Sequence, residues 1–150
     1  MAKNISQFFG SGSFFYQNSG ATNSTGLNYY EEYSDTSTSN WKYAGLPFNH
    51  QVNWVRIGKI ASWSWNIFTD VTVNNSYYSY YVPARFRPAQ QYLHGAIRVE
   101  NNSTQGLIGF WIYDVGSTSI QIYTSFSQQD FTGAGGTCGF SEYSGTWCMN

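Results

Sequence analysis

Apolar side chains recur at every second position between residues 52 and 73, and this pattern restricts the fold more than any other feature of the chain. From Val55 to Val73, eight of the ten odd-numbered residues are apolar, against two of the nine even-numbered residues between them. Successive side chains of a β-strand point to opposite faces, so the pattern predicts buried odd-numbered and solvated even-numbered residues. Because the run is longer than an ordinary strand and Gly58 can form a turn, we expect one strand at 52–57 and a longer one at 59–73.

Short strands separated by turns continue through the second half of the chain. We expect strands over 93–99, 107–113 and 119–126, and a last strand within 137–149. The 107–113 segment is apolar on both faces, which predicts a central strand covered on both sides. In 119–126 we expect Ile120, Ile122 and Phe126 to share one face. Since no segment has helical periodicity, the predicted fold class is all-β, an antiparallel sandwich or barrel.

The chain has 150 residues, enough for one domain, which we place at 1–150 with residues 1–11 as a loose N-terminal arm. The polar run 34–40 predicts an exposed loop that is too short to separate two domains. A hairpin near 143–145 would bring Cys138 and Cys148 together as a disulfide, whereas on a single strand they would lie about 33 Å apart. We expect two free thiols and no disulfide.

A low content of charged residues restricts what this chain can bind. Charged residues make up 10% of the sequence and aromatic residues 20%, so hydroxyls and amides keep the protein in solution. This composition suits a β-rich structure whose surface binds sugars or packs on copies of itself. With a net charge of −1, the chain has no electrostatic basis for binding nucleic acid, and its apolar runs are too short to insert across a membrane.

The segment Tyr80–Pro88 contains two of the three prolines, Pro83 and Pro88. Each proline fixes its own φ and favours extended geometry in the residue before it, so we expect a stiff, extended connector. In such a connector Phe86 faces the core, while Arg85 and Arg87 project the other way, toward solvent or a neighbouring subunit. Taken alone, the same pattern also fits a plain loop between two strands.

No combination of residues in the sequence predicts catalysis, a cofactor or a metal site. The two histidines, His50 and His94, lie outside any motif, and the carboxylates are scattered. A glycosidase would need two facing carboxylates, for which the candidates are Asp70 with Asp114 or Glu100. The chain has no phosphate-binding loop, nucleophile elbow or zinc spacing. We therefore expect a protein that is not an enzyme and that binds no cofactor.

The remaining chemistry is that of a binding surface. Aromatic rings stack on the apolar faces of sugars, and amide groups form hydrogen bonds with sugar hydroxyls. For each tyrosine the alternative is packing in the core or across a subunit interface, because few residues usually carry binding. The candidate ligand-binding residues are Trp41, Tyr43, His50, Asn74, Asn75, Tyr77 and Tyr78.

Three motifs in order resemble the head domains of phage and viral tail-fibre or spike proteins. They are Gly12-Ser13-Phe14-Phe15, then Trp54-Val55-Arg56-Ile57-Gly58-Lys59-Ile60, then Val82-Pro83-Ala84-Arg85-Phe86-Arg87-Pro88. In that family an Arg-Ile-Gly step begins a long strand, and a proline-flanked Phe-Arg connector follows it. Val82 stands where that pattern often has leucine. The resemblance extends from Gly10 to the C-terminus.

This resemblance implies a jelly-roll-like β-sandwich that assembles as a homotrimer and binds a host-cell receptor, often a glycan. The family's receptor contacts lie in variable loops, so no binding residue carries over. The implied partners are further copies of the chain, the receptor and other virion proteins. Within such a trimer, we expect Tyr80, Tyr81, Arg85 and Arg87 at the subunit interface.

The same resemblance implies a place on the virion surface. The first residues lack the apolar core of a signal peptide, so we expect synthesis in the host cytoplasm. Fibre proteins of this family carry a shaft or an anchoring segment before the head, and we expect almost none here. Two other functions fit the same composition. One is a cellular lectin-like or pore-forming β-sandwich, and the other is a purely structural capsid or decoration protein.

Overall fold

The computed structural model describes residues 16–17, 29–72, 74–89 and 92–149, and within them the chain is all β, with one 3-10 turn, η2 (Ala84–Phe86). The predicted N-terminal arm 1–11 and the motif 12–15 lie outside the described residues. No helix in the described part is long and apolar enough to cross a membrane. The strands are β1 (Tyr16–Gln17), β2 (Tyr29–Asp35), β3 (Trp41–Tyr43), β4 (Leu46–Pro47), β5 (Val52–Ile57), β6 (Ile60–Trp65), β7 (Phe68–Val71), β8 (Tyr78–Tyr81), β9 (Tyr92–Asn101), β10 (Thr104–Asp114), β11 (Ser119–Tyr123), β12 (Thr137–Phe140) and β13 (Tyr143–Cys148).

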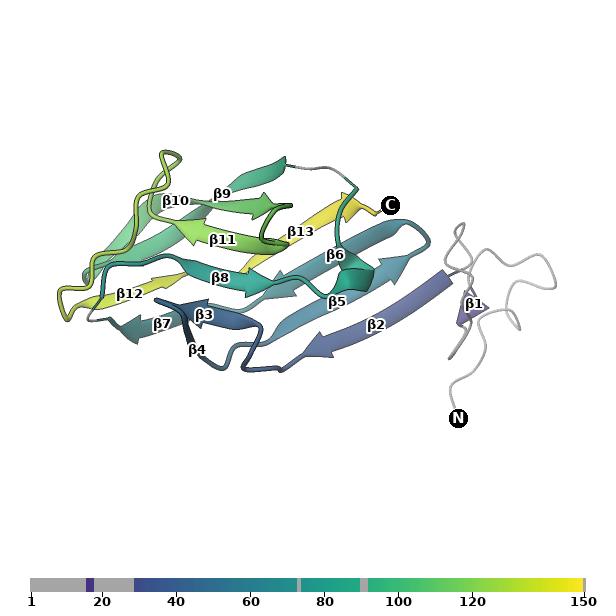
Figure 1. Ribbon diagram of the computed structural model, residues 1–150, viewed down its shortest axis with the longest axis horizontal. Coiled ribbons are helices and arrows are strands. Elements are labelled where there is room, and N and C mark those ends of the chain that lie inside the picture. Colours follow the sequence, from purple (N-terminus) through teal and green to yellow (C-terminus); the bar gives the residue numbers. More distant parts are fainter. Residues whose placement is uncertain (1–15, 18–28, 73, 90–91, 150) are drawn as a thin grey trace.

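Two sheets form a curled sandwich, which confirms the predicted fold class (Figure 1). The five-stranded sheet, sheet A, has the order β1-β2-β5-β6-β13, and the eight-stranded sheet, sheet B, has the order β4-β3-β8-β11-β10-β9-β12-β7. Every strand pair is antiparallel except β1 with β2. Strands β8 to β11 make a Greek key, the unit from which jelly rolls are built, because β8 lies beside β11 at the end of the β9–β10–β11 meander.

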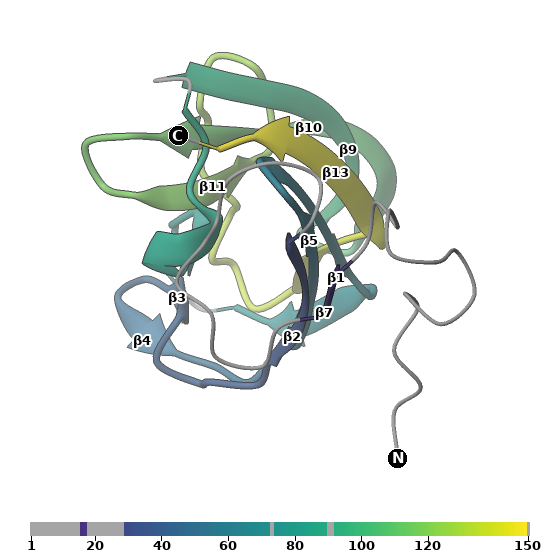
Figure 2. The same ribbon diagram turned by 90° about the vertical axis from the view of Figure 1, so that its right-hand side faces the viewer.

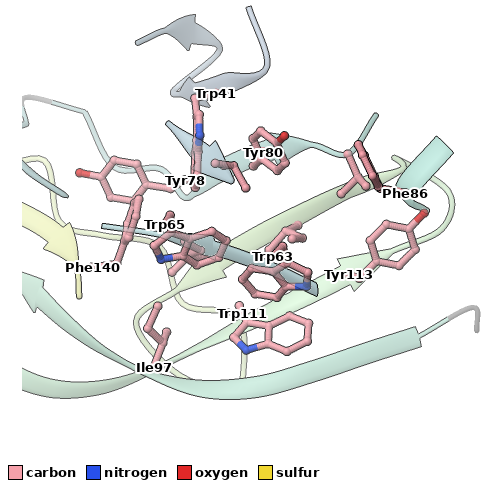
Figure 3. Close-up of a cluster of buried hydrophobic side chains, with 14 of the residues drawn as sticks. Trp41, Trp63, Trp65, Tyr78, Tyr80, Phe86, Ile97, Trp111, Tyr113 and Phe140 are labelled. Atoms are coloured by element: carbon pink, nitrogen blue, oxygen red, sulfur yellow. The ribbon is translucent and has the colours of Figure 1, made fainter. Parts of the chain in front are cut away.

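The core between the sheets consists mainly of aromatic rings. All six tryptophans are buried, and Figure 3 shows Trp63 and Trp65 of β6 lying among rings from sheet B. Trp41 stacks on Phe140 with ring centroids 5.3 Å apart, and Trp63 meets Trp111 edge-on at 5.4 Å. Most of the aromatic content noted in the sequence therefore fills the interior, where large rings give the greatest apolar burial per residue.

The strand at 52–57 is confirmed as β5, but its buried face differs from the prediction. Val52, Trp54 and Arg56 are buried, whereas the odd-numbered Val55 and Ile57 are half-buried. The turn to β6 consists of Gly58 and Lys59, so each even-numbered residue of β5 lies opposite an odd-numbered residue of β6. Paired residues share a face of the sheet, and the buried set therefore changes parity at this turn.

The predicted long strand at 59–73 is wrong, because the structure has two strands in different sheets. β6 ends at Trp65, and β7 begins at Phe68 and pairs with β12 of sheet B. A continuous strand would turn Val71 inward, yet Val71 is 59% exposed and Phe68 packs against the core. The break at Asn66 and Ile67 lets the chain pass from sheet A to sheet B.

Other strand predictions need smaller corrections. β10 is central in sheet B, but Leu107 and Ile108 are exposed, so only its second half is covered on both sides. β11 ends at Tyr123, and Phe126 lies beyond it, 60% exposed. The last predicted strand is two strands, β12 and β13, in different sheets. Both cysteines are free, as expected.

The connector after β8 contains a 3-10 turn and is not extended throughout. Pro83 precedes the turn, and its carbonyl accepts a hydrogen bond from the Phe86 N–H at 2.9 Å. The prediction that Phe86 enters the core is confirmed, since it is 0% exposed. The connector joins two strands of sheet B across the end of the sandwich and also bonds to sheet A, where the Trp147 indole N–H donates to the Phe86 carbonyl at 2.7 Å.

The loop after β2 is polar, as predicted, but it begins at a buried carboxylate. Asp35 is 1% exposed and accepts hydrogen bonds from the Ser37 N–H at 3.0 Å, the Asn40 amide at 2.8 Å and the Tyr80 hydroxyl at 2.6 Å. These bonds close the loop and attach sheet A to β8 of sheet B. Three donors compensate the carboxylate for its loss of water.

Candidate functional site

A pocket of about 260 Å³ opens where the two edges of sheet B approach each other. One side comes from β3 and β4, which begin the sheet, and the other from β7, which ends it; Figure 2 shows the strands curling around the core. We call this the seam pocket. Its lining consists of Tyr43, Ala44, Leu46, Pro47, Phe48, Phe68, Asp70, Val71, Thr72, Asn74 and Tyr78.

Aromatic rings from both edges form the wall of the seam pocket. Phe48 and Phe68 lie with ring centroids 4.5 Å apart, and this contact joins the two edges. Tyr43 packs on Tyr78 at 4.6 Å. Tyr78 is buried, whereas the other three rings are half-buried and partly face the pocket. The lips carry the exposed side chains of Leu46 and Val71, which are 67% and 59% exposed.

Polar groups hold one side of the seam pocket in place. The Tyr43 hydroxyl donates to the Asn74 carbonyl at 2.5 Å, and the Ala44 N–H donates to the Ser76 hydroxyl at 3.1 Å. Ala44 and Gly45 form the β3–β4 turn with φ of 49° and 78°. Glycine adopts this left-handed geometry readily, and the bond to Ser76 supports it at alanine. The turn is therefore fixed to the segment that leads into β8.

The phenols of the seam pocket are neutral hydrogen-bonding groups, and burial moves their pKa values further from physiological pH. Desolvation raises the pKa of Tyr43, partly offset by a hydrogen bond to Thr72. Desolvation also raises the pKa of Tyr78, further than that of Tyr43, and the nearby Cys138 adds to the effect. Both hydroxyls therefore stay protonated at physiological pH and act as neutral hydrogen-bonding groups.

Three of the seven candidate ligand-binding residues line the seam pocket: Tyr43, Asn74 and Tyr78. Trp41 does not belong to a surface platform, because it is 0% exposed and packs against Trp65 and Phe140. Tyr78 contributes a pocket wall, but at 1% exposed it belongs mainly to the core. Trp41 on β3 and Tyr78 on β8 are buried because alternate residues of a strand face the core. Their neighbours in the sequence are polar and resemble loops, so the sequence did not indicate this burial.

The other three candidates lie outside the seam pocket. His50 packs edge-on against Trp41 at 5.3 Å, its Nε2 lies 3.0 Å from the Asn66 carbonyl, and burial lowers its pKa. The Asn75 side chain accepts the Gly133 N–H at 2.7 Å and so holds a loop. Tyr77 lies on the outer side of sheet B against Tyr123, at 5.0 Å.

Several residues of the pocket lining were not among the predicted site residues, including Phe48, Phe68, Asp70 and Thr72. They come from opposite edges of one sheet, so their meeting depends on how far the sheet curls. No local pattern in the sequence carries that information. The only signal was the excess of aromatic residues, which does not distinguish a pocket wall from a core position.

The prediction that Tyr80 lies at a subunit interface is wrong. Tyr80 is 0% exposed, donates to Asp35 and accepts the Trp54 indole N–H at 3.1 Å, so it cannot face another subunit. Tyr81 is exposed, and Arg87 donates to its hydroxyl at 2.6 Å. Arg85 pairs with Glu31 at 2.8 Å and lies over the Tyr33 ring. The interface role of Tyr81, Arg85 and Arg87 stays a prediction.

Two of the carboxylates proposed for a glycosidase, Asp70 and Glu100, line different hollows. Asp70 lines the seam pocket and is the one carboxylate in its lining. Glu100 lines a separate hollow of about 360 Å³ with Arg98 and Glu142. No group of three or more His, Cys, Asp or Glu side chains that could hold a metal ion occurs among the described residues.

A third hollow, of about 440 Å³, lies over sheet A and is lined mainly by Ser, Thr and Asn side chains. Trp63 also lines it but is 2% exposed, so its ring belongs to the core. Compared with this hollow, the seam pocket offers both aromatic surface and hydrogen-bonding groups. That combination is typical of small-molecule sites.

No family model and no curated protein sequence matches this chain. Among solved structures, the chain is similar to the reovirus attachment protein sigma1, solved in complex with alpha-2,3-sialyllactose. The two are 13% identical, with a TM-score of 0.45, over 79% of this chain and 67% of that one.

Proposed function

We propose that this protein is a virion-surface head domain that binds a host-cell glycan in the seam pocket, without catalysis. The observation that carries the proposal is the pocket itself: half-buried aromatic rings beside neutral hydrogen-bonding groups. Such a combination matches a sugar, which has an apolar ring face and a rim of hydroxyls.

The groups in the seam pocket suit the two surfaces of a sugar ring. Tyr43 and Phe48 offer aromatic faces, and Asn74 and Asp70 offer amide and carboxylate groups. An amide both donates and accepts hydrogen bonds, and a carboxylate accepts two, as sugar hydroxyls require. Because hydrogen bonds already hold the β3–β4 turn, the turn loses little conformational entropy when a ligand binds.

Support for a place on the virion comes from the sequence resemblance described above. Two of its motifs fall on elements that enclose the core: the β5–β6 hairpin and the proline-flanked connector. Homotrimer formation and attachment to other virion proteins are further parts of the proposal. Tyr81, Arg85 and Arg87, on or next to the connector, are the residues we assign to the interface.

Filling the seam pocket is expected to remove glycan binding. Val71→Trp places a large side chain at a lip position that is 59% exposed, so the core is not disturbed. On a glycan array, the wild-type protein should bind a defined set of glycans, and Val71→Trp should reduce that binding about tenfold or more.

Val115→Trp is the matched control, because Val115 is 45% exposed in the β10–β11 turn, away from the seam pocket. It should bind glycans as the wild type does. Undiminished binding by a correctly folded Val71→Trp protein would contradict the pocket assignment. Lysis of lipid vesicles by the wild-type protein would instead favour the pore-forming alternative.

Arg85→Ala is expected to weaken assembly more than folding. The Arg85 side chain is 47% exposed and its ion pair with Glu31 is superficial, so removing it should lower the free energy of unfolding by about 1 kcal/mol or less. Sedimentation velocity at micromolar concentration should show a trimer for the wild type and a smaller species for Arg85→Ala. A monomeric wild type, or an unchanged Arg85→Ala trimer, would argue against this interface.

A further inference from the structure

Aromatic rings form a continuous row across the outer face of sheet B. We call this row the aromatic band; it consists of Tyr77, Tyr123, Phe110, Phe126, His94 and Tyr92. Ring centroids lie 5.0 Å apart for Tyr77–Tyr123, 5.1 Å for Phe110–Phe126, 5.6 Å for His94–Phe126 and 6.5 Å for Tyr92–His94. Phe110 and Tyr123 are direct partners on β10 and β11.

The aromatic band lies on the side of the sheet that faces away from the core. The core takes the alternate residues of the same strands, such as Trp111 and Tyr113 of β10, which Figure 3 shows inside the sandwich. Alternation therefore turns Phe110 outward. The exposed end of the band is formed by Tyr92 and Phe126, at 57% and 60% exposed.

Phe126 is presented by a loop that is held in one conformation. The Thr124 N–H donates to the Gln129 carbonyl at 2.9 Å, and the Gln128 N–H donates to the Ser125 carbonyl at 3.1 Å. Gln128 itself has a φ of 59°, an uncommon conformation for a residue with a side chain. Phe126 is mostly in solvent and forms one contiguous exposed aromatic patch with His94 and Tyr92, and such a patch indicates an interaction site.

The hydrogen-bonding groups next to these rings are amides and hydroxyls. The Gln128 amide donates to the Tyr92 hydroxyl at 3.3 Å, and the Tyr123 hydroxyl donates to Gln121 Oε1 at 2.9 Å. The Ser125 and Ser127 hydroxyls lie 2.9 Å apart on either side of Phe126 in the loop. Flat rings with such neighbours fit a carbohydrate better than a wholly apolar partner surface.

We propose that the aromatic band is a second binding surface, which takes the further units of an extended oligosaccharide. This inference rests on the proposed function, because it assumes that the chain binds glycans. Tyr123 in the middle of the band is only 7% exposed, so the accessible rings are Tyr92, His94 and Phe126. Their centroids follow one another at 6.5 and 5.6 Å, a row longer than one sugar ring can cover. An oligosaccharide therefore gains contacts here that a monosaccharide cannot make.

Oligosaccharide length is the variable that tests the aromatic band. We choose one series of glycans that the wild-type protein binds on an array. The full chain is titrated with the monosaccharide and with progressively longer oligosaccharides of that series. Phe126→Ala should weaken binding of the longest members roughly tenfold or more and leave the monosaccharide unchanged. Phe126→Tyr keeps a ring and should keep the affinity, and Val115→Ala serves as the control for loss of an exposed apolar side chain.

The outcomes separate this inference from the proposed function. If Phe126→Ala binds oligosaccharides of every length as the wild type does while Val71→Trp loses binding, the proposed role of the aromatic band is overturned and the seam pocket assignment stands. If Phe126→Ala changes the sedimentation of the wild-type assembly and not its glycan binding, the band is a protein interface and the inference is overturned. If the wild type binds no glycan, both proposals are wrong.

Discussion

Replacing Phe86 by alanine is expected to lower the free energy of unfolding by about 3–5 kcal/mol. The ring is 0% exposed and stacks on Trp54 with centroids 4.8 Å apart and planes 10° apart. It also stacks on Tyr33 at 5.8 Å. Alanine would leave a cavity between rings of sheet A, and the connector, fixed by its prolines and by the bond from Trp147, cannot move in to fill it.

Urea unfolding followed by tryptophan fluorescence measures this loss. Phe126→Ala is the matched control: it removes the same atoms from a side chain that is 60% exposed, and it should change stability by less than about 1 kcal/mol. Equal effects of the two substitutions would contradict the placement of Phe86 as a core residue. An unchanged unfolding midpoint for Phe86→Ala would do so as well.

Replacing Asp35 by alanine is expected to lower the free energy of unfolding by about 3–5 kcal/mol, although the sequence around it resembles an exposed loop. The carboxylate accepts three hydrogen bonds, and one comes from the Tyr80 hydroxyl, which is itself buried. Without Asp35, that hydroxyl loses its acceptor in a place that water does not reach. Burial already raises the pKa of Tyr80, so the hydroxyl stays protonated and continues to need an acceptor.

Asp35→Asn is the control of equal size. Its amide oxygen can still accept from both Tyr80 and Asn40, which donate to the same oxygen of Asp35. Its NH₂ group then faces the Ser37 N–H, so we expect a smaller loss, of about 1–3 kcal/mol. Calorimetry on both variants should give this order. A stability for Asp35→Ala within about 0.5 kcal/mol of the wild type would show that the buried carboxylate does not hold the sheets together.

The strands were predictable because their signal is local. Period-2 alternation gave the bounds of β5 and the existence of β6, and the burial of Phe86 followed from its place between two prolines. The parity of the buried face was not predictable from alternation alone. It depended on the two-residue turn at Gly58, which sets how residues of the two strands face each other.

Only part of the candidate site could be predicted. Tyr43 and Asn74 stood out because aromatic and amide residues flank polar turns, and both line the seam pocket. Trp41 and Tyr80 have the same local appearance, yet the structure buries them completely. Composition does not distinguish these cases, since a tyrosine on a strand faces the core or solvent according to the register of its neighbours.

Alternation and turn residues act within a few positions, so the amino-acid sequence was enough to predict many short antiparallel strands. Which strands share a sheet depends on contacts between distant segments. The tertiary structure separated β6 from β7, and it brought β4 and β7, the first and last strands of sheet B, to the two sides of one pocket. The physical reason is that sheet curl is a sum of twists and packing contacts over the whole sheet, and no single segment encodes it.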